Sequence, residues 1–371
     1  MTSTEARSYP LLGANSIFAS PKNRELDLDV VRGVAVLLAM GWHMNSYVGN
    51  PVFDALMAPG RAVGWAGVDL FFVLSGFLVG RMVFREEVRT GAFDFPTFFR
   101  RRVFKLWPML YLLIAVMMLG DRDWSEYVWQ CSLHLTNYFP PQHALQLWSL
   151  AVEEHFYLAL GLLVPAYLRR RTAWSLWPWL TGLMVLSFVL RLIGWRLGAS
   201  AQDLQWQTQY RIDALACGVL LALISVQRPQ LLDRMLKFRP LMAVIVVLGC
   251  VILTVNSKAS AFGETIGFSV SYLTAAAFML LIYRSGVDRV ASWPCRVIGF
   301  IGVYSYALYL WQMIALHYAP MLSAKIHGGQ VGQVVIAYAL DMVIAFIVTR
   351  MVERPAIWFR DRMFPAHATA V

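Results

Sequence analysis

Charged residues are scarce in this sequence. Only 15% of its 371 residues are Asp, Glu, Lys or Arg, whereas 58% are hydrophobic and 14% are aromatic. A soluble globular domain carries about 25% charged residues and about 45–50% apolar ones. The composition therefore excludes an ordinary soluble protein, and we expect lipid to be the solvent for most of the chain.

Several signatures of well-known enzyme classes are also missing. The sequence has no glycine-rich Walker or dinucleotide-binding fingerprint, no HExxH zinc motif and no GxSxG nucleophile elbow. Its four cysteines lie far apart, without a CxxC pair: Cys131, Cys217, Cys250 and Cys295. We therefore predict no disulfide framework, no metal site and no permanently bound cofactor.

What the sequence does contain is a series of apolar runs. Each is about 17 to 23 residues long, close to the length that crosses a hydrocarbon core of roughly 30 Å. They predict an all-α integral membrane protein with about ten transmembrane helices, at residues 29–49, 64–84, 103–120, 148–168, 174–195, 211–226, 240–256, 265–283, 297–319 and 332–351. No run of repeats or long loop indicates a second domain.

The net charge of +10 is distributed unevenly between the loops. Basic residues gather in alternate loops, near residues 85–105, 169–171, 228–239, 284–296 and 350–362. The other loops hold only scattered Arg122, Arg196, Lys258 and Lys325. By the positive-inside rule, both termini are predicted to be cytoplasmic, with tails at residues 1–25 and 361–371. The positive charge is thus explained by topology and by contact with membrane lipids, and we expect no nucleic-acid partner.

The first predicted span carries two functional candidates, Arg32 and His43. They are eleven residues apart, which at 100° per residue places them within about 20° of one helix face and about 16 Å apart along the axis. Ionisable side chains inside a membrane span cost several kcal/mol unless they face protein or water. We expect Arg32 near the cytoplasmic boundary and His43 in the outer half of the bilayer.

Three carboxylates are predicted to lie at the depth of His43. Asp69 enters early in the second span, and Glu153 and Glu154 lie early in the fourth. A histidine oriented by a carboxylate can take the proton of an incoming hydroxyl, so His43, Asp69, Glu153 and Glu154 are the candidate catalytic residues. The alternative is that these groups form helix–helix hydrogen bonds that hold a polar bundle together.

A basic run precedes the third span. Converging guanidinium groups bind phosphate, so Arg100, Arg101, Arg102 and Lys105 could hold a nucleotide-bearing acyl donor. Basic residues beside a span also bind anionic lipid headgroups and fix orientation. Composition alone leaves these two interpretations equal.

Together these residues resemble the acyltransferase-3 family, the bacterial membrane acyltransferases that decorate surface polysaccharides and related glycans. The resemblance covers residues 26–360 and rests on an Arg-x10-His spacing from Arg32 to His43 and on the block from Gly67 to Leu78. Further matching blocks are the arginine-rich run to Pro108, Trp148–Tyr157, Arg211–Leu215, Tyr304–Trp311 and Glu353-Arg354-Pro355. Gln312 stands where the family commonly has histidine, and Lys105 where it usually has arginine.

The resemblance implies that His43 is the key catalytic residue. It also implies that Arg32 and the arginines at 100–102 assist acyl-CoA, a donor substrate with acetyl as its first-choice group. The expected acceptor is a sugar hydroxyl of an exopolysaccharide, a lipopolysaccharide or a lipid-linked glycan, outside the cell inner membrane. Polysaccharide-assembly proteins are further expected partners. Direct attack on the donor and an acylated His43 both remain open.

A glycan-precursor transporter or flippase is the alternative of another class, because a polar seam through many spans can line a conduction path. The sequence shows no inverted repeat and no paired broken spans, which are the features that favour a transporter. It therefore favours an acyltransferase.

Overall fold

The computed structural model describes residues 25–44, 48–120, 127–169, 171–286, 289 and 292–364. The two predicted tails lie largely outside these residues. Every element in the described part is a helix, which confirms the predicted all-α class. The long helices are α1 (Leu26–His43), α3 (Gly67–Thr90), α4 (Phe95–Gly120), α5 (Trp148–Leu168), α6 (Trp177–Arg196), α8 (Thr208–Gln227), α10 (Arg239–Val255), α11 (Phe268–Ile282), α14 (Ser305–Lys325) and α15 (Gly329–Val348).

Shorter helices connect them. They are α2 (Pro51–Val63), η2 (Gly64–Ala66), η3 (Tyr127–Cys131), η4 (Leu145–Leu147), η5 (Ala173–Leu176), α7 (Ala201–Trp206), α9 (Pro229–Lys237), η6 (Gly263–Gly267), α13 (Ser292–Val303), η7 (Thr349–Glu353) and α16 (Arg354–Met363). Each of the ten predicted segments falls on one of the long helices or on a bent pair.

Seven helices in the described part are long and apolar enough to cross a membrane, or up to nine if each of two bent pairs counts as one span. The pairs are α9 with α10, bent by 69°, and α13 with α14, bent by 73°. Helix α1 is a further buried helix of 18 residues, and it carries Asp27, Asp29 and Arg32. The predicted first span, residues 29–49, is therefore too long, because α1 already ends at His43.

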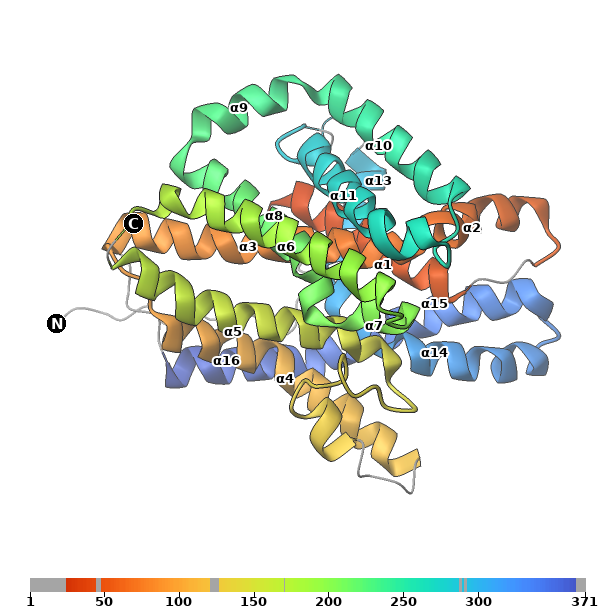
Figure 1. Ribbon diagram of the computed structural model, residues 1–371. Coiled ribbons are helices and arrows are strands. Elements are labelled where there is room, and N and C mark those ends of the chain that lie inside the picture. Colours follow the sequence, from red (N-terminus) through yellow and green to blue (C-terminus); the bar gives the residue numbers. More distant parts are fainter. Residues whose placement is uncertain are drawn as a thin grey trace.

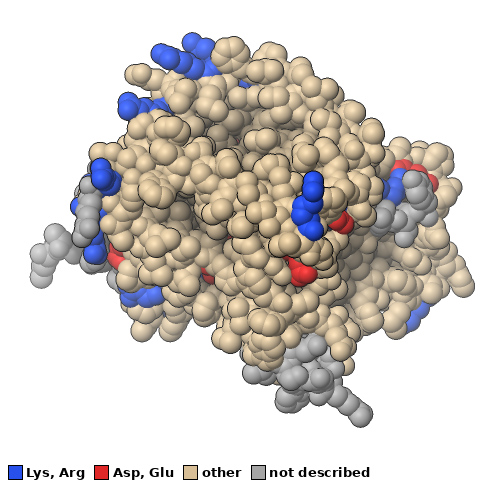
Figure 2. Space-filling model, viewed as in Figure 1, with Lys and Arg blue, Asp and Glu red and all other residues tan. Residues whose placement is uncertain are grey.

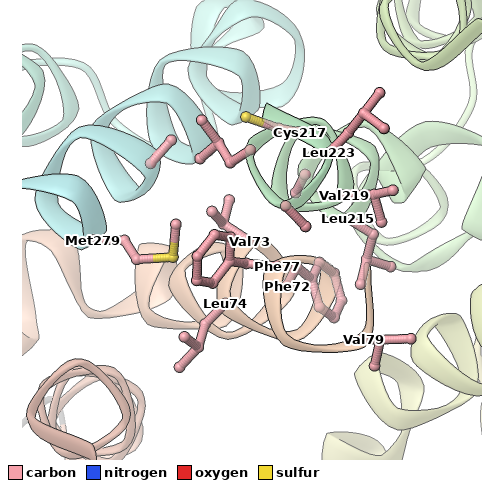
Figure 3. Close-up of a cluster of buried hydrophobic side chains, with 14 of the residues drawn as sticks. Phe72, Val73, Leu74, Phe77, Val79, Leu215, Cys217, Val219, Leu223 and Met279 are labelled. Carbon is pink, nitrogen blue, oxygen red and sulfur yellow. The ribbon is translucent and has the colours of Figure 1, made fainter. Parts of the chain in front are cut away.

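The centre of the bundle is the contact between α3 and α8. Phe72, Val73 and Phe77 of α3 meet Leu215 and Val219 of α8 in a core from which water is excluded (Figure 3). The two backbones approach closely because Gly76 lies directly against the main chain at Leu215 and against Gly218. Small residues at a helix interface allow this approach within a membrane, where van der Waals packing drives association.

Around this centre the other helices form one bundle (Figure 1). The α14–α15 hairpin projects toward one end, and the junction of α3 with α4 lies at the opposite end. Helices α9 and α10 arch over one flank of the bundle, and α4 and α16 lie along the other. Most of the polar residues described below lie on α1, α3, α4, α5, α6, α8 and α11.

The predicted basic loops gather on one face of the bundle. Contacts connect several of these loops and the segments beside them: Arg81 with Glu25, Arg284 with Asp27 and Asp233, Arg228 with Trp174, and Arg360 with the main chain of Arg101. In Figure 2, several blue side chains gather at the left and upper-left margins of the view, and isolated charged side chains lie right of the centre and on the right side. We call the side of the bundle that carries these basic loops the basic face.

Candidate functional site

Helix α1 carries Arg32 and His43 on one continuous helix, as predicted. Arg32 donates to Asp29 one turn earlier at 2.5 Å, and a quarter of its side chain is exposed. His43 is the last residue of α1, and its side chain is exposed. Eleven residues of helix separate the two by about 16 Å along the axis.

Helix α2 and the connection from α10 to η6 border the end of α1 that carries His43. Gly41 lies against Gly60 of α2, which brings the C-terminal part of α2 onto the end of α1 that carries His43. The ammonium of Lys258, on the connection from α10 to η6, lies 5.3 Å from the ring centre of Trp42. The charge of Lys258 acts on the imidazole of His43. We call this end of the bundle the His43 mouth.

Asp69 is fully enclosed and is held by two donors. Arg211 of α8 donates to its Oδ1 at 2.5 Å, and Ser271 of α11 donates to its Oδ2 at 2.6 Å. No hydrogen bond joins Asp69 to His43 among the described residues. In this arrangement the aspartate positions α8 and α11 rather than the imidazole.

A second buried ion pair lies beside the first. Arg191 of α6 donates to Asp213 of α8 at 2.9 Å and to Ser269 of α11 at 2.8 Å. Neither side chain is more than 2% exposed. The two arginines and two aspartates balance in charge, which is how a membrane interior can hold four ionisable groups.

Glu153 and Glu154 belong to a different group, centred on Arg102. Tyr157 donates to Glu153 at 2.8 Å and Ser75 donates to the same oxygen at 3.3 Å. The guanidinium of Arg102 lies 3.5 Å from the ring centre of Tyr157, and its charge acts on both glutamates. The structure thus joins a predicted donor-binding residue to two predicted catalytic ones. We call these five residues the Arg102 cluster.

The other members of the basic run point elsewhere. Arg100 is exposed and lies 4.9 Å from the ring of Phe364, while Lys105 is also exposed. The main-chain oxygen of Arg101 accepts from Arg360. Only Arg102 of this run turns toward the interior glutamates, so the run divides between the basic face and the bundle.

The candidates do not share one depth, contrary to the expectation from spacing. Gly67 packs against Ala35 and Ala39 of the antiparallel α1, so Asp69 lies level with about residue 35, roughly 12 Å inward from His43. Ser75 is six residues further along α3, which is about 9 Å deeper. Polar groups therefore succeed one another from the His43 mouth, through Asp69, to the Arg102 cluster.

Sequence reasoning missed several buried polar residues. Arg191 was not singled out, although a lone arginine inside an apolar run is a signal. Asp341 of α15 is also fully buried, and neither of its carboxylate oxygens has a hydrogen-bond partner in the described part. Ser75 and Tyr157 gave no signal, because hydroxyl groups are common in membrane helices. His155, which follows the glutamate pair, contacts Thr208 at 2.9 Å.

No group of three or more His, Cys, Asp or Glu side chains converges as metal ligands would within the described ranges. The chemistry available is that of the exposed imidazole of His43 at one end, the carboxylates of Glu153 and Glu154 beside Arg102 further in, and the basic face beyond them. Such an arrangement can accept a proton at the mouth and bind an anionic ligand on the basic face.

Comparisons with known proteins find relatives named as acyl-transferring enzymes. A "Putative peptidoglycan O-acetyltransferase YrhL" of Bacillus subtilis is 26% identical over 365 residues, 88% of this chain and 54% of that protein. A "Putative membrane-bound transacylase BcsY" of Komagataeibacter xylinus is 25% identical over 367 residues, 92% of this chain and 85% of that protein. A "Putative O-acetyltransferase" of Staphylococcus aureus strain COL is 24% identical, over 88% of this chain and 56% of that protein.

The chain thus spans about half the length of the Bacillus and Staphylococcus relatives. No solved structure gives a significant match. The family model described as "Acyltransferase domain", Acyl_transf_3, matches residues 25–350, which include every candidate residue discussed above. This multi-pass membrane protein belongs to the Acyl_transf_3 family of acyltransferases.

Proposed function

We propose that the chain is an O-acyltransferase of the cell inner membrane that moves an acyl group, acetyl in the first instance, from cytoplasmic acyl-CoA to a sugar hydroxyl on the outer side. The observation that carries the proposal is the succession of polar groups from the basic face to His43. A transporter would also need a polar route, but the family match favours group transfer.

The donor is proposed to dock its phosphates on the basic face. Arg100, Arg101 and Lys105 lie at that face, and Arg102 lies at the inner end of the polar succession. Arg32, on the same helix as His43, is proposed to contact the pantetheine arm as it passes inward. Guanidinium groups suit this role because they bind phosphate bidentately and keep their charge when partly buried.

His43 is proposed to act at the reacting carbonyl. As a general base it accepts the proton of the acceptor hydroxyl while that oxygen attacks the thioester carbonyl carbon. The carbon–sulfur bond then breaks, and the leaving CoA thiolate takes the proton. Alternatively, His43 attacks first, releases CoA and passes the acyl group to the hydroxyl. Asp69, Glu153 and Glu154 are proposed to support this step through the arginines that they bind.

The acceptor is proposed to be a polysaccharide or a lipid-linked precursor. Relatives are named as a peptidoglycan O-acetyltransferase and as a membrane-bound transacylase, which supports an envelope glycan without fixing which one. Proteins of polysaccharide assembly are the expected partners.

The test compares wild-type membranes with membranes containing His43→Ala, incubated with labelled acetyl-CoA. We expect label in base-labile esters of the glycan and glycolipid fractions for the wild type, and a loss of about 100-fold or more for the variant. His317→Ala is the matched control, because His317 is an exposed histidine on α14, outside the site. Equal labelling by wild type and a folded His43→Ala contradicts the role of His43. No labelling with any acyl donor contradicts the proposed activity.

A further inference from the structure

Lys258 occupies the edge of the His43 mouth and is not part of the family pattern described above. It lies on the short connection between α10, which ends at Val255, and η6, which begins at Gly263. Gly263 packs directly against the main-chain oxygens of Ser257 and Lys258, which folds this connection back onto the helix start. The ammonium is thereby fixed over the ring of Trp42, the residue before His43.

The side chains packed beneath Lys258 are aromatic, and two of them, Trp65 and Phe268, are buried. Trp65 and Phe268 meet edge to face with ring centres 5.6 Å apart, and Trp42 packs against the same cluster. From the bundle side, the guanidinium of Arg211 lies 4.0 Å from the ring centre of Phe268. Two cations therefore flank one aromatic cluster, Arg211 from within and Lys258 at the mouth.

The two cations differ in how their charge is balanced. Arg211 is neutralised by Asp69 at 2.5 Å, and the neighbouring Arg191 by Asp213 at 2.9 Å. Lys258 makes no ion pair and no hydrogen bond with any described residue. Asp69 is the acid whose charge acts on it, and that carboxylate is already bound to Arg211.

Burial and the charge of Arg211 lower the pKa of Lys258 to about 8. The side chain is partly buried, yet it remains mainly protonated at neutral pH. A partly desolvated cation without an acidic partner gains free energy when an anion reaches it. The charges of Arg211 and Asp69 act on Lys258, the charge of Lys258 acts on His43, and none of these three groups is a free anion.

We propose that Lys258 binds an acidic group of the acceptor, so that the acceptor is a sugar bearing a carboxylate or a phosphate ester near the hydroxyl that is acylated. This inference rests on the proposed function and adds the chemical class of the acceptor. A lysine suits either group, because its ammonium is a compact charge without the planar geometry of arginine. Trp42 is partly exposed beside Lys258 and offers its ring face to the sugar, while Trp65 and Phe268 are buried beneath it.

The test uses two acceptors that differ only in charge: an oligoglucuronate and its carboxyl-reduced, neutral counterpart. Purified protein in lipid nanodiscs is given labelled acetyl-CoA and either acceptor. We expect wild type to favour the acidic acceptor by about tenfold or more in kcat/KM, the effect of one charged hydrogen bond. Lys258→Met should remove this preference through KM, Lys258→Arg should keep most of it, and Lys325→Met, at another outer lysine, should leave it unchanged.

Equal use of both acceptors by an active wild type overturns the inference, as does an equal loss on both acceptors in Lys258→Met. Binding of the two oligosaccharides, followed by tryptophan fluorescence without acetyl-CoA, separates this inference from the proposed activity. Charge-dependent binding that requires Lys258 supports the inference even where no transfer occurs. Absence of such binding together with absence of transfer overturns it.

Discussion

At the residue scale, the Arg102 cluster is where charge balance depends most on one side chain. The charge of Arg102 acts on both Glu153 and Glu154, and Glu154 has a carboxylate oxygen without a hydrogen-bond partner. Removing one partner of a buried ion pair is more costly than replacing both partners by apolar residues, because the remaining charge stays desolvated and unpaired. The cluster should therefore respond to single and double substitutions in a non-additive way.

We predict that Arg102→Gln destabilises the protein by about 3 kcal/mol, the cost of leaving buried carboxylates uncompensated. Arg102→Gln combined with Glu154→Gln should recover part of that loss, because the like-charged pair is then reduced to one carboxylate. Thermal unfolding in detergent measures both effects. Arg100→Gln serves as the control, since Arg100 is exposed, and its loss should stay below about 1 kcal/mol. Simple additivity of the two substitutions would contradict the shared network.

The ion pair between Glu25 and Arg81 makes a pH-dependent contribution. Two hydrogen bonds of 2.8 and 2.9 Å from Arg81 lower the pKa of Glu25 below its ordinary value of 4.5, against the opposing effect of burial. A carboxyl group with a lowered pKa stabilises the fold above its unfolded pKa, and that contribution is lost as pH falls through the folded pKa.

We therefore predict that Glu25→Gln lowers the melting temperature slightly at pH 7 and that the difference from wild type vanishes on acidification below 4.5. The effect should be small, because 44% of the Glu25 side chain is exposed and solvent screens the pair. Melting curves recorded from pH 7 to pH 3 test this. A difference that persists unchanged at low pH would show that the variant acts through packing rather than charge.

Single residues were predictable where the sequence placed an ionisable group in an apolar run. Arg32, His43, Asp69 and the glutamate pair were found in this way. Their partners were not, because Arg211 reaches Asp69 from a helix 142 residues away, and no spacing rule connects them. The prediction that the candidates share one depth was also wrong. Helix α1 ends at His43, and the packing of α3 against α1 places Asp69 further into the bundle.

At the element scale, α1 and α13 are held together by glycines. Gly33 of α1 lies against the main-chain oxygen of Ile298, and Gly302 of α13 lies against that of Asp29. This contact fixes the segment of α1 that carries Asp29 and Arg32. A side chain at either glycine must push the two helices apart, because main-chain atoms cannot rotate out of the way.

We predict that Gly302→Ala lowers stability by about 1–3 kcal/mol through overpacking and also reduces acyl transfer by displacing Arg32. Gly182→Ala in α6 is the matched control, since no atom lies within 4 Å of the added methyl group. The control should be neutral or stabilising by up to about 1 kcal/mol, because alanine is the better helix former. The melting temperature and the acyl-transfer rate of both variants test these two effects. A harmless Gly302→Ala would show that the interface can relax.

Hydropathy located the long helices but not their breaks. The predicted span 297–319 is divided at Tyr304, where α13 and α14 meet at 73°. Both halves are apolar, so hydropathy cannot register the bend. Helix α2 was also missed, because Asp54, Pro59 and Arg61 interrupt its apolar pattern. Its start did carry a signal, since Asn50 caps the helix and Pro51 occupies the first turn.

At the scale of the whole molecule, the distribution of charge indicates an orientation. The basic loops were predicted to share one side, and contacts such as Arg284 with Asp233 and Arg360 with the main chain of Arg101 place them on one face. The His43 mouth lies at the other end of α1. The positive-inside rule assigns the basic face to the cytoplasm, where the proposed donor is made.

We therefore predict that an impermeant maleimide labels Lys325→Cys in intact cells and labels Thr90→Cys only after lysis. Both positions are exposed, and they lie at the ends of α14 and α3. A second pair lies at the two ends of the bent pair α9–α10. Ser257→Cys should be labelled in intact cells, and Gln230→Cys only after lysis. The background should lack the four native cysteines.

The four positions together distinguish the alternatives. If only Thr90→Cys and Gln230→Cys were labelled in intact cells, the orientation would be the reverse of the predicted one. His43 would then lie on the cytoplasmic side, and donor and acceptor would have to meet there. Protection of Lys325→Cys with labelling of Ser257→Cys would show instead that the bent pair α13–α14 does not cross the bilayer. The orientation that delivers an acyl group outward requires Lys325→Cys and Ser257→Cys to react together, because the α14–α15 turn and the loop carrying Lys258 then face the same solvent as His43.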